Sequence, residues 1–170
     1  IYMTNHLIIM AGGVGSRFWP MSTPEKPKQF IDVLGVGKSL LQLTVDRFGG
    51  LFTPDRIWVV TSGAYRDIVK EQLPDVPEEN ILPEPCMRNT APCIAYAAWK
   101  IKQRHPDATM VVSPADDVIL DGEKFRSVIE AGITFVRHSG RVLTLGMLPT
   151  RPDTGYGYIQ AGAAVHGFAG

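Results

Sequence analysis

The sequence predicts an α/β domain built on a mainly parallel sheet, and three observations support this class. The first is composition, because 45% of the 170 residues are apolar and 20% are charged, as in a globular domain with a sizeable core. The second is the alternation of short apolar runs with longer stretches of helical periodicity. The third is that polar or glycine-rich loops follow several of these runs, as at the ligand-binding edge of a parallel sheet.

The first half of the chain is expected to begin with a strand at residues 6–10, an apolar run that ends at a glycine-rich loop. A helix at residues 39–48 follows, because Ser39 and Gln42 have the spacing of a capping box. The next elements are a strand at 56–61, a helix at 64–73 and a short strand at 80–84.

The second half is expected to continue the same order. A helix at residues 91–104 has apolar side chains at helical spacing, with Thr90 as its N-cap and Pro92 in the first turn, where proline is tolerated. A strand at 109–113, a helix at 121–138, a strand at 141–147 and an extended run at 158–161 complete the pattern. The loops that follow the strands should therefore lie along one edge of the domain.

The loop after the first strand carries the strongest functional signal. Without side chains, the amides of Gly12, Gly13 and Gly15 can converge on an anion such as a triphosphate. Arg17 and Lys28 add fixed positive charge nearby. A polyphosphate reaction needs this combination of close backbone approach and cations.

Two better-known phosphate motifs fit the chain poorly. The dinucleotide-binding pattern begins at Gly13 and Gly15, but its third glycine position is Phe18, and a proline-containing loop follows where a helix is required. Residues 37–39 resemble the end of a Walker A loop, but the first glycine of that motif would fall at Asp32.

Two further loops carry polar side chains that suit a nucleotide. Asp116 follows a buried strand, where a carboxylate is a good ligand for the Mg²⁺ that accompanies a nucleoside triphosphate. Asn89 precedes a helix N-terminus, and its amide offers both a donor and an acceptor to a base edge. Taken alone, either residue could equally serve as a turn or helix cap.

Four segments in order resemble the sugar-1-phosphate nucleotidylyltransferase family. Its signature is similar to residues 12–30, and the details at 18–20 and 28–30 look most like the members that transfer a guanylyl group to mannose 1-phosphate. The later segments are residues 88–92, 114–117 and 149–159. The resemblance implies a three-layer α/β/α, Rossmann-like nucleotide-diphospho-sugar transferase fold. Residues 1–170 are then expected to be the N-terminal part of a single nucleotidyltransferase domain, incomplete at the C-terminus.

The resemblance also implies a reaction in which GTP and mannose 1-phosphate give GDP-mannose and pyrophosphate, with Mg²⁺ as cofactor and in-line attack on the α-phosphate. Arg17 and Lys28 would be catalytic, Arg17 with the glycine amides on the β- and γ-phosphates and Lys28 on the α-phosphate or the incoming phosphate. The implied nucleotide-binding residues are Ala11, Gly12, Gly13, Gly15, Arg17, Lys28, Asn89, Thr90 and Asp116. The implied sugar contacts are Tyr156 and Gly157, and the implied metal ligand is Asp116. Asp117 receives no role, because the family often has histidine there.

Three alternatives remain beside this interpretation. A guanylyltransferase or other nucleotidylyltransferase for a different sugar 1-phosphate, such as a heptose, fits the same motifs. A catalytically silent, nucleotide-sensing subunit of the same fold also fits, although the presence of Arg17, Lys28 and Asp116 together argues against silence. A dehydrogenase module is disfavoured by the missing third glycine.

Charge and cysteine content narrow the partners and the compartment. Lysine plus arginine and aspartate plus glutamate number 17 each, so no basic field suggests nucleic acid. No apolar run approaches the length of a membrane span. Cys86 and Cys93 form neither a disulfide framework nor a zinc pattern, and a reducing cytoplasm is the expected location. Assembly into a homo-oligomer is left open by these observations.

Overall fold

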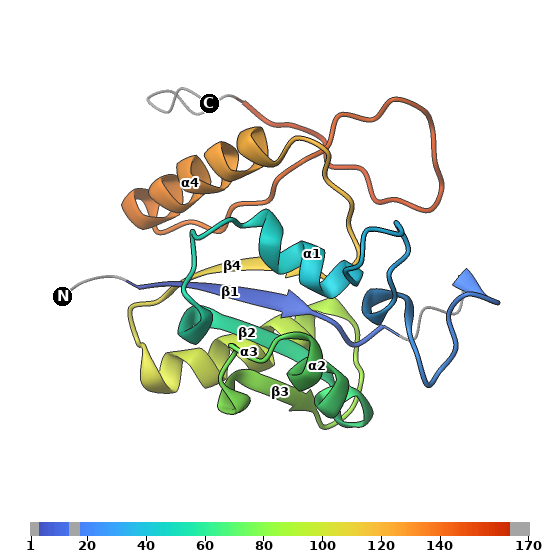
Figure 1. The fold of residues 1–170 in the computed structure, drawn as a ribbon. Coiled ribbons are helices and arrows are strands. Elements are labelled where there is room, and N and C mark those ends of the chain that lie inside the picture. Colours follow the sequence, from blue (N-terminus) through green and yellow to red (C-terminus); the bar gives the residue numbers. More distant parts are fainter. Residues whose placement is uncertain (1–3, 14–17, 164–170) are drawn as a thin grey trace.

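The computed structural model describes residues 4–13 and 18–163, and it contains a parallel sheet flanked by helices (Figure 1). The described strands are β1 (Asn5–Met10), β2 (Ile57–Ser62), β3 (Ile81–Glu84) and β4 (Thr109–Pro114), in the order β3-β2-β1-β4. The described α-helices are α1 (Leu40–Arg47), α2 (Arg66–Gln72), α3 (Thr90–Arg104) and α4 (Gly122–Ser139). All strand pairs are parallel, with Ile8 of β1 opposite Trp58 on one side and Val112 on the other.

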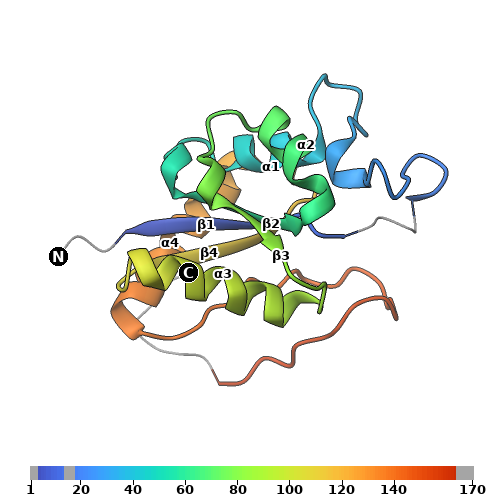
Figure 2. The same cartoon turned by 90° about the horizontal axis from the view of Figure 1, so that it is seen from below.

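Helices cover both faces of the sheet, as the predicted three-layer α/β/α fold requires (Figure 2). Successive strand residues point to opposite faces, so Leu7 and Ile9 join one apolar cluster and Ile8 joins the other. The first cluster includes side chains of α1, α2 and α4, and the second includes side chains of α3. The fold-class prediction is therefore confirmed for the described residues.

Most elements lie within a few residues of their expected positions, and the capping box is confirmed. The backbone N–H of Gln42 donates to Ser39 Oγ at 3.2 Å, and the backbone N–H of Ser39 donates to Gln42 Oε1 at 3.0 Å. The start of α3 differs, because Thr90 is the first helical residue and Asn89 occupies the N-cap without a side-chain cap bond. The predicted cap was thus one residue too far along the chain.

The strand predicted at 141–147 and the extended run predicted at 158–161 were wrong, since neither segment forms a strand in the described structure. A strand requires a neighbouring backbone to pair with. Here β4 pairs with β1, and the segment after α4 packs on that helix instead. A Cβ atom built on Gly132 of α4 would lie 3.0 Å from Leu143 Cδ2.

A buried histidine lies on β1, in a cluster separate from the glycine-rich loop. Trp58 Nε1 donates to His6 Nδ1 at 3.0 Å, so the proton of the neutral ring is assigned to Nε2, which lies 3.1 Å from Thr4 Oγ1. Arg56 Nη1 lies 3.2 Å from the same nitrogen and, because a guanidinium can only donate, makes no hydrogen bond to it in this tautomer. Burial, followed by the nearby His105 and Arg56, lowers the pKa of His6 to about 4. Protonation of Nδ1 would cost the bond from Trp58.

This cluster predicts that the protein loses stability in mild acid. The pKa of His6 in the folded state lies below its ordinary value. The contribution of neutral His6 to the free energy of unfolding is therefore complete above about pH 6.5 and is lost as the pH falls toward 4. The loss is about 3 kcal/mol at most. Urea unfolding between pH 7.5 and 5 should therefore show a shallower pH dependence for His6→Gln. His138→Gln, on an exposed residue of α4, should keep the parent slope. Equal slopes for parent and His6→Gln would contradict the prediction.

Candidate active site

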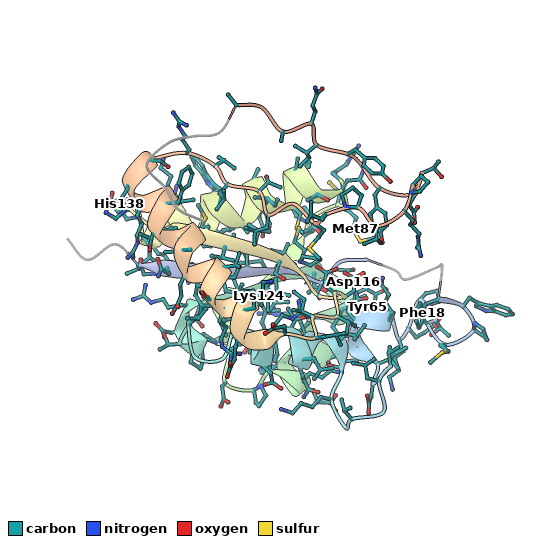
Figure 3. The ribbon with its side chains drawn as sticks, turned by 90° about the horizontal axis from the view of Figure 1, so that it is seen from above. Phe18, Tyr65, Met87, Asp116, Lys124 and His138 are labelled. Carbon is teal, nitrogen blue, oxygen red and sulfur yellow. The ribbon has the colours of Figure 1, made fainter. Side chains whose placement is uncertain are left out.

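The loops after β1, β3 and β4 meet at the carboxyl edge of the sheet, as predicted. Met87 and Asp116 lie at that end in Figure 3, while His138 lies at the other. A Cβ atom built on Gly12 would lie 3.0 Å from Glu84 Oε2 and 3.9 Å from Met87 Sδ. The loops after β1 and β3 are therefore in direct contact.

Gln29 holds the glycine-rich loop in place through two hydrogen bonds, although the sequence had not marked it as a site residue. Gln29 lies in the one-turn helix Lys28–Phe30, and its Nε2 donates to the carbonyls of Ala11 at 3.0 Å and Gly13 at 2.8 Å. The N–H of Gly12 belongs to the same trans peptide as the carbonyl of Ala11, so it points away from Gln29. A buried amide side chain thus fixes the orientation of this loop peptide, with the N–H of Gly12 turned away from Gln29. A polar residue between Lys28 and the apolar Phe30 was the available signal.

Two predicted site residues from distant parts of the chain form an ion pair. Lys28 Nζ contacts Asp116 Oδ2, and the two side chains are 32% and 33% exposed. Lys28 comes from the one-turn helix below the glycine loop, and Asp116 comes from the loop after β4. Both charged atoms are therefore partly accessible to a ligand at the carboxyl edge.

Glu84, at the end of β3, is a second residue that the sequence analysis missed. Its carboxylate borders Gly12 and interacts with the Cys93 thiol. Burial raises the pKa of Glu84. Burial also raises the pKa of Cys93 to about 11, with Glu84 adding to the effect. Cys93 therefore stays a neutral thiol, and Glu84 is a half-buried acceptor beside the loop. The signal for Glu84 was its position between two prolines at a strand end.

Asn89 has an unusual backbone conformation at the start of α3. Its φ is 66° and its ψ is −168°, and it is the one non-glycine residue with positive φ in the described part of the chain. Such a conformation costs on the order of 1–3 kcal/mol and must be imposed by its surroundings. Asn89 and Thr90 are both exposed, at the helix end where backbone N–H groups favour polar ligands.

The family described as nucleotidyl transferase matches residues 6–169, almost the whole chain. The chain belongs to the nucleotidyl transferase family. It is 41% identical over 160 residues to a mannose-1-phosphate guanylyltransferase of Escherichia coli, covering 93% of this chain and 33% of the relative. A mannose-1-phosphate guanylyltransferase of Salmonella montevideo is 42% identical over the same length and coverage. This chain therefore spans about a third of the length of these curated relatives.

Two solved structures have a similar fold. One is described as mannose-1-phosphate geranyltransferase from Thermus thermophilus, with a TM-score of 0.77 and 31% identity over 91% of this chain and 44% of that chain. The other is described as mannose-6-phosphate isomerase from Helicobacter pylori, with a TM-score of 0.61 and 21% identity over 80% of this chain and 47% of that chain. The second likeness shows the fold alone.

In this nucleotidyl transferase, two of the predicted site residues are not described, and two others lie in the segment after α4. Gly15 and Arg17 lie outside the described residues, so their roles stay predictions. Tyr156, which is 73% exposed, and Gly157 lie in the segment after α4. No hydrogen bond or ion pair recorded for the described residues connects them to the glycine loop or to Asp116.

The carboxylates after β4 suit a metal ion whose remaining ligands are waters and substrate phosphates. No group of three His, Cys, Asp or Glu side chains among the described residues could hold an ion alone. Asp116 offers partly exposed oxygens, and Mg²⁺ binds through one or two carboxylates together with waters and substrate phosphates. Asp117 is the neighbouring carboxylate, and partial desolvation followed by the charge of Asp116 raises its pKa. The residues present are thus compatible with Mg²⁺ that arrives with a nucleotide.

None of the described helices of this nucleotidyl transferase combines the length and apolar character that crossing a membrane requires.

Proposed function

We propose that this chain is the nucleotide-binding part of a mannose-1-phosphate guanylyltransferase, which converts GTP and mannose 1-phosphate to GDP-mannose and pyrophosphate. The observation that carries the proposal is the pairing of Lys28 with Asp116 beside the glycine-rich loop. This arrangement puts a cation and a candidate metal ligand where a triphosphate would enter. The names of the similar curated proteins favour this reaction within the family.

The chemistry to be catalysed is the meeting of two polyanions, so positioning and charge neutralisation supply most of the rate. The N–H of Gly12, with Arg17, would hold the β- and γ-phosphates and stabilise the leaving pyrophosphate. Lys28 would exchange Asp116 for the α-phosphate or the incoming sugar phosphate. The sugar phosphate oxygen then attacks the α-phosphorus in line. No covalent intermediate with the protein is required.

Asp116 would hold Mg²⁺, which supplies Lewis-acid stabilisation of phosphate oxygens when it is bound. Before the metal binds, the ion pair with Lys28 would keep the Asp116 carboxylate beside the glycine-rich loop. Tyr156 and Gly157 are proposed to contact the sugar. The free cysteines Cys86 and Cys93 favour a reducing cytoplasm as the compartment, and a homo-oligomer remains a prediction.

The nucleobase would lie between Glu84 and Asn89, at the carboxyl end of β3. Guanine presents N1–H and the N2 amino group side by side, and a carboxylate can accept from both. Uracil and thymine present a carbonyl on either side of a single N–H, and adenine presents an acceptor at N1. Glu84 therefore favours guanine, and Asn89 can satisfy a further donor or acceptor.

Glu84→Gln is expected to reduce the preference for GTP over ATP and UTP by about 10-fold or more, because one of two acceptors becomes a donor. The measurement is kcat/KM for each nucleotide. Glu71→Gln, on an exposed residue of α2, is the matched control and should keep the parent ratio. If Glu84→Gln keeps the parent ratio of kcat/KM values for GTP and the other nucleotides, Glu84 does not take part in base recognition.

The proposed reaction is tested by pyrophosphate release with GTP, ATP, UTP and dTTP, each offered with mannose 1-phosphate and with other sugar 1-phosphates. Release that depends on both GTP and mannose 1-phosphate supports the proposal. Equal release with UTP or dTTP would contradict guanine selection, and release with a different sugar would move the assignment within the family. GTP binding without pyrophosphate release from a protein of the relatives' full length would favour a nucleotide sensor.

A further inference from the structure

Arg47, at the end of α1, reaches across to the loop that carries Asp116. Its Nη2 donates hydrogen bonds to the backbone carbonyl of Asp117 and, at 3.3 Å, to Thr44 Oγ1. Its guanidinium carbon lies 5.7 Å from the ring centroid of Phe125, on α4. A planar guanidinium held by these three neighbours keeps one orientation, so the Asp117 carbonyl is tied to both helices.

The charge of Arg47 lies beside the acidic loop after β4. Its Nη1 is buried and has no hydrogen-bond partner in the part of the chain that the structure describes. The guanidinium interacts electrostatically with Asp117, whose carboxylate is next to that of Asp116. A cation at this position opposes the mutual repulsion of the two carboxylates. A surface arginine that merely solubilises α1 would not need to be half-buried against Phe125.

The other end of α1 is tied to the segment that carries Lys28. The backbone N–H of Leu40 donates to the carbonyl of Ile31 at 3.3 Å, directly after the one-turn helix Lys28–Phe30. Gln72 Nε2 donates to the carbonyl of Phe30 at 3.0 Å, and Ser39 Oγ donates to Gln72 Oε1 at 2.6 Å. The helix therefore connects the two segments that supply the ion pair.

We propose that Arg47 is a positioning residue that holds the loop after β4 so that Asp116 stays beside Lys28, ready for a divalent cation. It acts through the Asp117 carbonyl and does not touch substrate. The inference rests on the proposed function in one respect only, that the site takes a divalent cation.

Mn²⁺ binding to the chain, followed by electron paramagnetic resonance first without nucleotide and then with saturating GTP, tests the proposal, because the described carboxylates need waters or substrate phosphates as further ligands. Arg47→Met should raise the Kd for Mn²⁺ by about 10-fold or more, as loss of a residue that orients a ligand does. Arg47→Lys keeps the charge and one donor and should recover part of the loss. Arg66→Met is the matched control, because Arg66 lies on α2 in a surface ion pair with Glu78 at 3.1 Å. It should bind Mn²⁺ like the parent.

Urea unfolding of each variant separates positioning from stability. If Arg47→Met does not fold, Arg47→Lys decides, and a parent Kd in that variant would overturn the proposal. A parent Kd in a folded Arg47→Met would overturn it too, as would a parent chain that binds no Mn²⁺ either with or without GTP. Mn²⁺ binding without pyrophosphate release would refute guanylyl transfer alone and leave the role of Arg47 standing.

Discussion

Lys28→Met is expected to lower turnover by about 10²-fold or more, the usual cost of removing a group that stabilises developing charge. Lys28 is a cation at the carboxyl edge, paired with Asp116 and one-third exposed. The methionine keeps the length of the apolar stem, so packing below the glycine loop is preserved. The loss should therefore appear in kcat/KM for pyrophosphate release, with little change in the urea midpoint.

Lys38→Met provides the control for this experiment. Lys38 also pairs with an aspartate, Asp46, at 2.6 Å, but this pair is exposed and lies away from the glycine loop. Surface pairs of this kind contribute little to stability. Near-normal turnover in Lys28→Met, or an equal loss in Lys38→Met, would show that Lys28 has no special role.

The strand and helix pattern could be predicted because it depends on neighbouring residues. The apolar run of β1 and the capping box of Ser39 and Gln42 are local signals, and both appear in the structure as expected. The strand predicted at 141–147 failed for the opposite reason. Alternation describes a surface that suits a sheet, but pairing depends on which backbone is available, and Leu143 packs on α4 instead.

The candidate site was predictable only where glycines, charges and strand ends mark it. Lys28 and Asp116 could be named from such marks, and the structure brings them together. Gln29, Glu84 and Arg47 were missed, because each acts through a contact with a segment distant in sequence. The sequence signals at Gln29 and Glu84 mark a polar residue but do not name the group that it contacts. The folded arrangement supplies that partner.

Asp116→Asn is expected to raise the Mg²⁺ concentration for half-maximal pyrophosphate release by about 10-fold or more and to lower turnover in parallel. Asparagine has the same shape and can still accept from Lys28, so the loop should stay in place while the charge is lost. The same loss frees Lys28 for phosphate, so GTP binding measured without metal should be equal to the parent's or tighter. Weaker dependence on Asp116 for GTP binding than for Mg²⁺ binding distinguishes this result from damage to the fold, because a damaged fold would weaken the binding of both.

Asp46→Asn is the matched control, since Asp46 is an exposed aspartate in the pair with Lys38 at 2.6 Å. It should leave both the Mg²⁺ dependence and GTP binding at parent values. An unchanged Mg²⁺ activation curve in Asp116→Asn would show that this carboxylate does not hold the metal. Asp117 would then be the next residue to substitute, because its carboxylate is the neighbouring one and is electrostatically coupled to Asp116. Weaker GTP binding without metal would instead mean that the ion pair organises the phosphate site and does not compete with the nucleotide for Lys28.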